Sequence, residues 1–290
     1  MFPKVLPLVS ALIIFLLFSC NKSTQKVVSI EKDTTFDELS LCREGVIDYD
    51  IKTVKSVGVD SKNRTKIISE VHIKYPELKC ANDKLQSSVN AYVKNFIETI
   101  LKDNMNAEDT AKAKTIKTAA QAFVRSCKSN IFESKKEDVF TDQVWYCDVI
   151  GNIEMQSGRY FTIRFKYSAY TGGAHGEYGE DFSTFDINTG KQLTCSDIII
   201  NQEKFTKLAE LRFKQVNGIS ATDKLTEDEG FLFENNKFYI SDNFGLNSDG
   251  LVIYYMPYEV APFSFGATTL LFKYSEIIDY LNPALFQENI

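Results

Sequence analysis

Two stretches near the start of the folded region alternate apolar and polar residues at every second position. They cover residues 46–59 and 66–75, and the second carries its apolar residues at Ile67, Val71, Ile73 and Tyr75. A period of two is typical of half-buried β-strands. We therefore predict two strands here, the second of them ending at Pro76.

A period of three to four residues predicts helices farther along the chain. Asn82 is placed to cap a helix that runs to about Lys102, with apolar residues on one face. A second helix is expected over 106–126, with acidic residues in its first turn, and a third over 202–216, ending at Asn217-Gly218. A short last helix is expected from Ser275 to just before Pro283.

Further strands are predicted between and after these helices. The segment 144–185 has strand character interrupted by turns at Ser157-Gly158 and at Thr171-Gly172-Gly173. Four later strands are expected near residues 231–233, 237–240, 251–255 and 268–273. Because helices and strands come in blocks and do not alternate, we predict an α+β fold with mainly antiparallel sheets. Its domains are expected at 45–200 and 201–290, the second packed on the first.

The first residues are typical of a lipoprotein signal. Lys4 precedes an apolar run from Val5 to Phe18, which is too short to cross a bilayer as a helix. The ending Leu17-Phe18-Ser19-Cys20 resembles a bacterial lipobox, which implies removal of residues 1–19 and lipidation of Cys20. An ordinary secretory signal is the alternative. Residues 20–44 would then tether the protein to a membrane, and we expect it in the cell envelope, facing the periplasm from the outer membrane of a Gram-negative bacterium.

Charge and cysteine content narrow the classes further. With 33 basic and 39 acidic residues the formal charge is -6, and no basic stripe is present, so nucleic acid is not an expected partner. Cys20 aside, five cysteines remain, so at least one is unpaired outside the cytosol. Cys195 can serve as a small buried apolar residue. We expect the disulfides Cys42–Cys80 and Cys127–Cys147, although the residues alone allow other pairings.

The second half contains several motifs of one known family. They are Tyr170-Thr171-Gly172-Gly173-Ala174-His175-Gly176, then Phe185-Asp186 with Thr189-Gly190-Lys191, and Pro257-Tyr258-Glu259-Val260-Ala261-Pro262-Phe263-Ser264-Phe265-Gly266. Together they resemble the extracytoplasmic domain pair of RsiV-type anti-sigma factors and PdaC-type peptidoglycan deacetylases, over residues 45–285. The resemblance implies a ligand-binding module, because RsiV-like members bind lysozyme outside the cell. An anti-sigma role is not expected, since no sigma-binding segment is recognisable.

The residues do not favour deacetylase chemistry. Such a metal-dependent enzyme needs an Asp and two His on the metal, and this chain has only His72 and His175, not spaced as HxxxH. His175 and Glu177 lie in a glycine-rich loop that could hold acid–base chemistry. The simpler interpretation, which we favour, is that the glycines form a turn and His175 bonds a nearby carbonyl. No metal or cofactor is expected.

Two functions therefore stay open. The first is a non-enzymatic, membrane-anchored lipoprotein that binds a lysozyme-like hydrolase or a cell-wall fragment, and the second is a cell-wall hydrolase that uses the His175 loop and nearby carboxylates. The binding candidates are His175, Tyr170, Glu177, Tyr258, Phe263 and Phe265. The alternative for the rings of the Pro257–Gly266 segment is that they pack into the core, and the residues favour this alternative.

Overall fold

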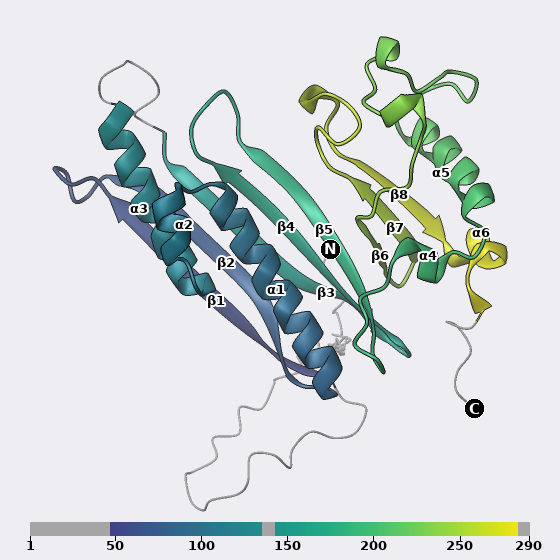
Figure 1. Ribbon diagram of the computed structural model, residues 1–290, viewed down its shortest axis with the longest axis horizontal. Coiled ribbons are helices and arrows are strands. Elements are labelled where there is room, and N and C mark those ends of the chain that lie inside the picture. Colours follow the sequence, from purple (N-terminus) through teal and green to yellow (C-terminus); the bar gives the residue numbers. More distant parts are fainter. Residues whose placement is uncertain (1–46, 135–142, 284–290) are drawn as a thin grey trace, which may run out of the picture. The chain divides into compact units, whose positions relative to one another are not determined.

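The protein is described from a computed structural model, and the description covers residues 47–134 and 143–283 of the chain (Figure 1). The predictions that concern the signal sequence, Cys20, the tether and Cys42 lie outside these residues. The described part combines two sheets with several helices, so the predicted α+β class is confirmed. Within it, no helix is long and apolar enough to cross a membrane.

The larger sheet has five strands in the order β1-β2-β3-β4-β5. Its β2–β3 pair is parallel and its other pairs are antiparallel. The strands are β1 (Asp48–Val59), β2 (Ile67–Cys80), β3 (Trp145–Ser157), β4 (Tyr160–Tyr170) and β5 (Glu177–Asp186).

The predicted end of the second strand at Pro76 is wrong, because β2 continues to Cys80. Pro76 lies opposite Ile51 of β1, while β3 pairs with β2 only as far as Lys74. The missing N–H of the proline therefore costs no hydrogen bond to β3.

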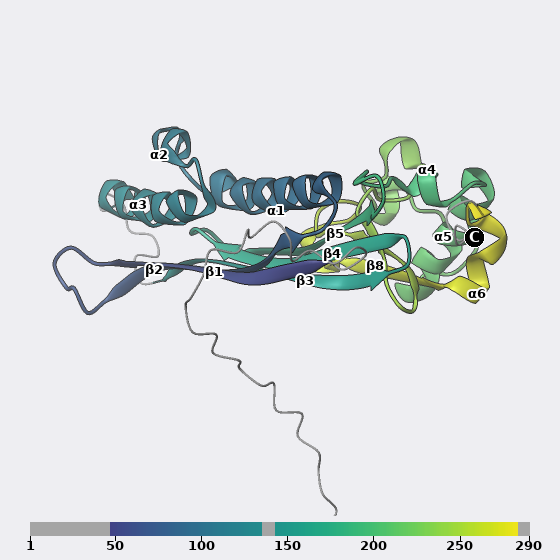
Figure 2. The ribbon, with the colours of Figure 1, turned by 90° about the horizontal axis from the view of Figure 1, so that it is seen from below.

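Three helices lie on one side of this sheet, two of them directly against it and the short one packed on the helix that follows it (Figure 2). They are α1 (Asp83–Asp103), α2 (Ala107–Lys112) and α3 (Ile116–Ser134). The Asn82 side chain accepts from the Leu85 N–H at 2.9 Å, which confirms the predicted cap. The single helix predicted over 106–126 is wrong, because Asn106 caps α2 and a new helix starts after Thr115. The Thr115 hydroxyl accepts from the Thr118 N–H at 3.1 Å and so supports that second start.

The core of this layer joins the inward residues of the strands to the apolar faces of α1 and α3. In β2 and β3 the residues Val71, Ile73 and Val149 are fully or almost fully buried, as their period of two requires. The α1 residues in this core repeat every three to four positions: Leu85, Val89, Val93, Ile97 and Leu101.

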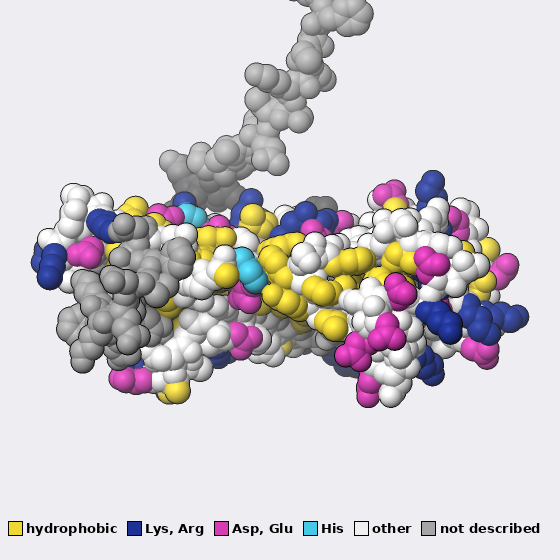
Figure 3. Space-filling model, turned by 90° about the horizontal axis from the view of Figure 1, so that it is seen from above, with side chains coloured by type: hydrophobic (Ala, Val, Ile, Leu, Met, Phe, Trp, Pro, Cys, Tyr) yellow, Lys and Arg dark blue, Asp and Glu magenta, His cyan; other side chains and the backbone are white. Residues whose placement is uncertain are grey.

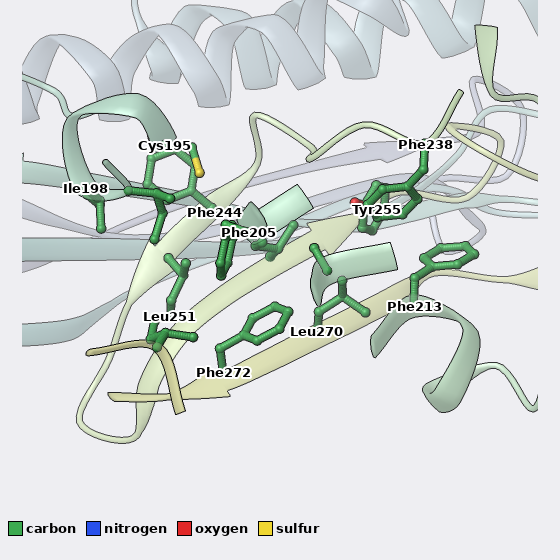
Figure 4. Packing of buried hydrophobic residues seen from close by; sticks show 14 of the residues in the cluster. Cys195, Ile198, Phe205, Phe213, Phe238, Phe244, Leu251, Tyr255, Leu270 and Phe272 are labelled. Atoms are coloured by element: carbon green, nitrogen blue, oxygen red, sulfur yellow. The ribbon is translucent and has the colours of Figure 1, made fainter. Parts of the chain in front are cut away.

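A second core forms around a three-stranded antiparallel sheet, β6 (Phe244–Leu246), β7 (Gly250–Tyr255) and β8 (Thr268–Lys273). The predicted helix 202–216 is confirmed as α5 (Gln202–Val216), and the short helices α4 (Cys195–Ile198) and α6 (Tyr274–Ile277) accompany it. Phe205 and Phe213 of α5 pack against side chains of this sheet, among them Phe272 and Tyr255 (Figure 4).

The strands predicted at 231–233 and 237–240 are wrong. The chain there forms a short 3-10 helix, η3 (Glu234–Asn236), in which Asn235 and Asn236 have positive φ angles of 54° and 55°. Phe231, Phe233 and Phe238 are buried nonetheless. Their spacing comes from packing around Phe213, whose ring centroid lies 5.6 Å from that of Phe233 and 5.7 Å from that of Phe238.

The side chain of Asn243 joins the smaller sheet to the edge of β5. The Phe182 N–H donates to Asn243 Oδ1 at 2.9 Å, and Asn243 Nδ2 donates to the Glu180 carbonyl at 2.7 Å. The Asn243 side chain thus makes the two backbone hydrogen bonds that a neighbouring strand would make to this part of β5. Beside it, Phe182 packs against Val252 and Tyr254 of β7.

Cys127 and Cys147 do not pair as predicted. Cys127, Cys147 and Cys195 are buried free thiols, so the Cys127–Cys147 disulfide is wrong, whereas Cys195 is a buried core residue as expected. Cys127 instead donates from α3 to the Ile68 carbonyl at 3.5 Å. Burial raises the pKa of Cys147 to about 12. The Cys42–Cys80 pair cannot be described, because Cys42 and the Cys80 side chain lie outside the described part.

Candidate binding pocket

Two segments far apart in the sequence meet at one end of β5. The loop between β4 and β5 turns at Gly172 and Gly173, whose φ angles of 102° and 88° favour glycine. The segment Met256–Gly266 lies between β7 and β8 and contains the 3-10 helix η4 (Phe263–Phe265). Both segments carry family-like motifs, and the fold brings them into contact.

His175 is the centre of that contact. Its Nδ1 lies 2.8 Å from the Gly176 carbonyl oxygen, which can only accept, so Nδ1 carries the proton. Nε2 is then free to accept from the Tyr258 hydroxyl at 3.3 Å. The imidazole also stacks on Phe263, with ring centroids 3.9 Å apart and an interplanar angle of 14°. The carbonyl bond expected for His175 is present, and two aromatic contacts accompany it.

Tyr258 has a backbone conformation that is rare for its residue type. Its φ angle is 69°, in the left-handed region. Glu259 holds the turn, because its Oε2 accepts from the Met256 N–H at 2.8 Å. The ring is 57% exposed in spite of this constraint. A non-glycine residue held in this region with its ring in solvent is typical of a functional site.

These residues line a surface pocket of about 300 Å³. Asn104, just after α1, forms its polar wall: Asn104 Nδ2 donates to Glu177 Oε1 at 2.7 Å, and Thr171 Oγ1 donates to Asn104 Oδ1 at 3.2 Å. The sequence reasoning missed Asn104, because only the fold brings the end of α1 to this loop. Its position directly after a predicted helix was the one available signal.

Five of the six predicted binding residues line this pocket: Tyr170, His175, Glu177, Tyr258 and Phe263. The Tyr170 hydroxyl donates to the Gly173 carbonyl at 3.0 Å and fixes the loop. Phe265 differs, because its ring faces Phe231, 5.6 Å away between centroids, and Phe213. The Pro257–Gly266 segment is therefore divided: Val260 and Ala261 enter the core, whereas Tyr258 and Phe263 belong to the pocket.

The pocket opens onto a row of exposed apolar side chains, which we call the aromatic band. The Leu232 N–H donates to the Val260 carbonyl at 2.9 Å, so the two segments that carry the band lie side by side. Figure 3 shows hydrophobic side chains gathered beside a histidine on this face, with acidic side chains next to them. The members and their exposed fractions are Tyr178 43%, Tyr258 57%, Phe265 37%, Tyr239 38% and Leu232 51%.

A partly buried carboxyl lies on β5 beneath α1. Tyr92 of α1 donates its hydroxyl to Asp181 Oδ2. Burial raises the pKa of Asp181 to about 6, against the lowering effect of that hydrogen bond. Burial and the Asp181 charge raise the pKa of Tyr92. Two phenylalanines surround the pair, with ring centroids 6.0 Å (Phe165) and 5.6 Å (Phe185) from that of Tyr92.

Asp186 of the Thr189-Gly190 motif has a structural use. Its carboxylate accepts from Arg159 Nε at 2.6 Å and from the N–H groups of Asn188 and Thr189 at 3.0 and 2.9 Å. Although burial opposes it, these bonds hold the pKa of Asp186 below its usual value. Gly190 lies so close to Lys84 that a Cβ would come within 2.5 Å of its carbonyl carbon. Asp186 thus seats this turn against the start of α1.

The contacts of His175 are with the Gly176 carbonyl, the Tyr258 hydroxyl and aromatic rings. Across residues 47–134 and 143–283, no group of three or more His, Cys, Asp or Glu side chains is arranged to hold a metal ion. The pocket offers aromatic surface, the His175 imidazole, hydroxyl groups of Thr171 and the tyrosines, one carboxylate and one amide.

Comparison with known protein families divides the chain in two. Residues 61–178 match the model of the family described as Deacetylase PdaC, and residues 196–275 match that of the Protein of unknown function DUF3298. The two matches together support a PdaC/DUF3298 domain pair. The β4–β5 loop up to Tyr178 belongs to the PdaC match, and the Met256–Gly266 segment belongs to the DUF3298 match. The pocket thus combines residues of both members of the pair.

Solved structures share the fold of this domain pair. A member of the DUF3298 family from Bacteroides fragilis NCTC 9343 is 20% identical, with a TM-score of 0.63 over 84% of this chain and 98% of that chain. A DUF3298 family protein from Pseudomonas aeruginosa PAO1 is 16% identical, with a TM-score of 0.53 over 83% of this chain and 96% of that chain. No curated protein sequence matches the chain.

Proposed function

We propose that this protein is a non-enzymatic lipoprotein of the cell envelope that binds a protein, of the lysozyme-like hydrolase class, through the His175 pocket and the aromatic band. The observation that carries the proposal is the meeting of the two motif-bearing loops, in which Tyr258 contacts His175 at 3.3 Å while its own ring stays 57% exposed. Exposed tyrosines and phenylalanines on ordered loops are typical anchors of protein interfaces.

A protein ligand is favoured over a cell-wall fragment by the extent of the band. The 300 Å³ pocket could hold a single sugar, but the exposed apolar side chains continue from Tyr178 to Leu232 on neighbouring segments. A contiguous apolar surface of this kind is used for macromolecular contact. A peptidoglycan fragment that fills only the pocket would leave Leu232 and Tyr239 without a role.

The hydrolase alternative has less support from the contacts of His175. A general base is normally oriented by a carboxylate or a similar group, and it needs access to the proton that it abstracts. His175 Nε2 already faces the Tyr258 hydroxyl, and Asp181, whose pKa burial raises to about 6, is bonded to Tyr92 instead. The deacetylase named in the PdaC family description is not part of the proposal.

Anchoring is the second part of the proposal. The Leu17-Phe18-Ser19-Cys20 sequence supports lipid attachment at Cys20, and the following polar residues would give the folded part its reach. Replacing Cys20→Ala should move the protein from the membrane fraction to the soluble fraction or stop its processing. Unchanged fractionation together with unchanged gel mobility would contradict lipidation.

Binding is tested directly with hen egg-white lysozyme and with purified peptidoglycan fragments. The wild-type protein, Tyr258→Gly and the control Tyr49→Ala, which removes an exposed ring from β1, are compared by calorimetry. We expect lysozyme binding that Tyr258→Gly weakens about 5- to 30-fold and Tyr49→Ala leaves unchanged. Equal affinity in all three would exclude the pocket as the site, and binding of peptidoglycan alone would exclude the protein ligand.

A further inference from the structure

The lining of the His175 pocket contains an acidic side chain, that of Glu177, and no Lys or Arg. In the described part of the chain, the side chain of Glu177 accepts from the neutral Asn104 amide, which donates to one carboxylate oxygen at 2.7 Å. The carboxylate of Glu180, by contrast, is held in ion pairs with Arg164 and Lys166. Glu177 is therefore an exposed carboxylate in the lining of the pocket, and no ion pair with a described Lys or Arg compensates its charge.

The pocket field is negative beyond Glu177 itself. Burial raises the pKa of Tyr167, which lines the pocket, to about 12, and the charges of Glu177, Asp181 and Asp103 add to the rise. A negative field stabilises a cation and opposes an anion.

Aromatic rings provide the other walls. Tyr178 and Phe263 meet edge to face at 5.8 Å, and Tyr258 lies 5.3 Å from Phe263, all between ring centroids. Ring faces carry negative charge density and attract ammonium and guanidinium groups, Arg more often than Lys. Aromatic rings around one carboxylate are thus suited to a cationic group on an apolar stem.

We propose that the pocket formed by Glu177, Tyr178, Tyr258 and Phe263 is a receptor site for one Arg or Lys side chain of the partner protein. The proposal rests on the function inferred above and names the chemistry of the contact. The side chain would enter with its charge toward Glu177 and its methylene groups against the rings, while residues around it lie on the aromatic band. Acidic residues close to the band, including Glu259 and Glu234, favour a basic partner surface.

The test uses the full chain in a neutral detergent and three short capped peptides, acetyl-Gly-Arg-Gly-amide, its Lys analogue and its Gln analogue. The chain has two histidines, so ring resonances report the site directly: His175 lies in the pocket, and His72 on β2 is an internal control. We expect the Arg and Lys peptides to shift the His175 resonance at millimolar concentration, and the Gln peptide and the His72 resonance to show no change.

Two variants that remove the same charge separate the site from general electrostatics. Glu177→Gln should weaken the Arg peptide at least 10-fold, whereas Glu203→Gln on the exposed face of α5 should change its affinity less than 2-fold. An equal response to the Gln peptide, or an unchanged affinity in Glu177→Gln, would overturn the proposal.

The experiment distinguishes failure of the cation site from failure of the proposed function. If lysozyme binds the wild type and Glu177→Gln equally well, the protein-binding function stands and the cation site is wrong. If the Arg peptide binds and depends on Glu177 but lysozyme does not bind, the site stands and the partner class is wrong.

Discussion

Two groups of aromatic residues in this protein have similar composition and opposite surroundings. Around Phe213, the rings of Phe231, Phe233, Phe238 and Tyr255 are buried, with centroids between 5.4 and 6.1 Å from that of Phe213. Around His175, the Tyr178 and Tyr258 rings are 43% and 57% exposed. The first group is closed on all sides by α5 and the smaller sheet, and the second is closed on one side only. Residue type alone therefore does not say whether an aromatic cluster stabilises the fold or is available to a ligand.

The largest expected effect comes from the centre of the buried group. Phe213→Ala removes a fully buried ring that contacts five others and should lower the free energy of unfolding by about 3–5 kcal/mol. Urea unfolding at pH 7 measures the change. A loss below about 1.5 kcal/mol would mean that this cluster is loosely packed and would remove the contrast.

A substitution of Asp181 tests whether water is excluded from the region around this carboxyl. Its folded pKa of about 6 lies above the ordinary 3.8, so the protonated form is favoured in the fold. The protonated Asp181 carboxyl favours the folded state fully below about pH 4, and this stabilisation is lost as the pH rises through 6. Asp181→Asn should therefore raise the free energy of unfolding by about 1–2 kcal/mol at pH 7 and leave it unchanged at pH 4. Urea unfolding at both pH values measures the difference, and equal effects at the two would contradict burial as the cause.

Phe265 lies between the two groups and should show an intermediate cost. Its ring contacts Phe231 and Phe213 yet remains 37% exposed. We expect Phe265→Ala to lower the free energy of unfolding by about 1 kcal/mol, because only part of the buried area is lost. A thermal melt beside Phe213→Ala measures it, and an equal shift in the two variants would assign Phe265 to the core.

The smallest effect on folding is expected at Tyr258. Tyr258→Gly removes an exposed ring and also releases the strain of a φ angle of 69°, so stability should change by less than about 0.5 kcal/mol. Tyr258→Ala keeps the strain and serves as the matched control, expected to be slightly less stable than the glycine variant. A loss of several kcal/mol in either variant would show that the ring is part of the core after all.

Periodicity predicted the elements whose burial follows one regular face. α1, α5 and the strands β1 and β8 each present a repeat to a single layer, so their positions could be read from the sequence. The errors fall where a local contact overrides the repeat. Thr115 starts a new helix inside an unbroken apolar pattern, and Phe231, Phe233 and Phe238 alternate like a strand while the backbone turns through Asn235 and Asn236.

The site was predicted in part for a related reason. Four of the five predicted pocket residues lie within two motifs, which made His175 and Tyr258 recognisable before their contact was known, and Glu177 directly follows the first motif. Asn104 could not be assigned, because its neighbour Glu177 is distant in the sequence and its role depends on the angle at which α1 crosses the sheet. The Cys127–Cys147 pairing failed similarly: both thiols face apolar surroundings, but from different elements.

The parallel pairing of β2 with β3 bears on how the chain acquires its fold. Val71 pairs with Cys147, about 75 residues later, so the chain entropy lost in closing this crossover precedes most of the gain from packing. The hairpin β1–β2 can form early, because its strands are joined by a short turn. Until β3 pairs with β2, Val71 and Ile73 in that hairpin have a neighbouring strand on one side only. While the chain folds, the β1–β2 hairpin therefore has one edge unpaired, and we expect the closure of the crossover to β3 to be slow compared with the formation of the hairpin.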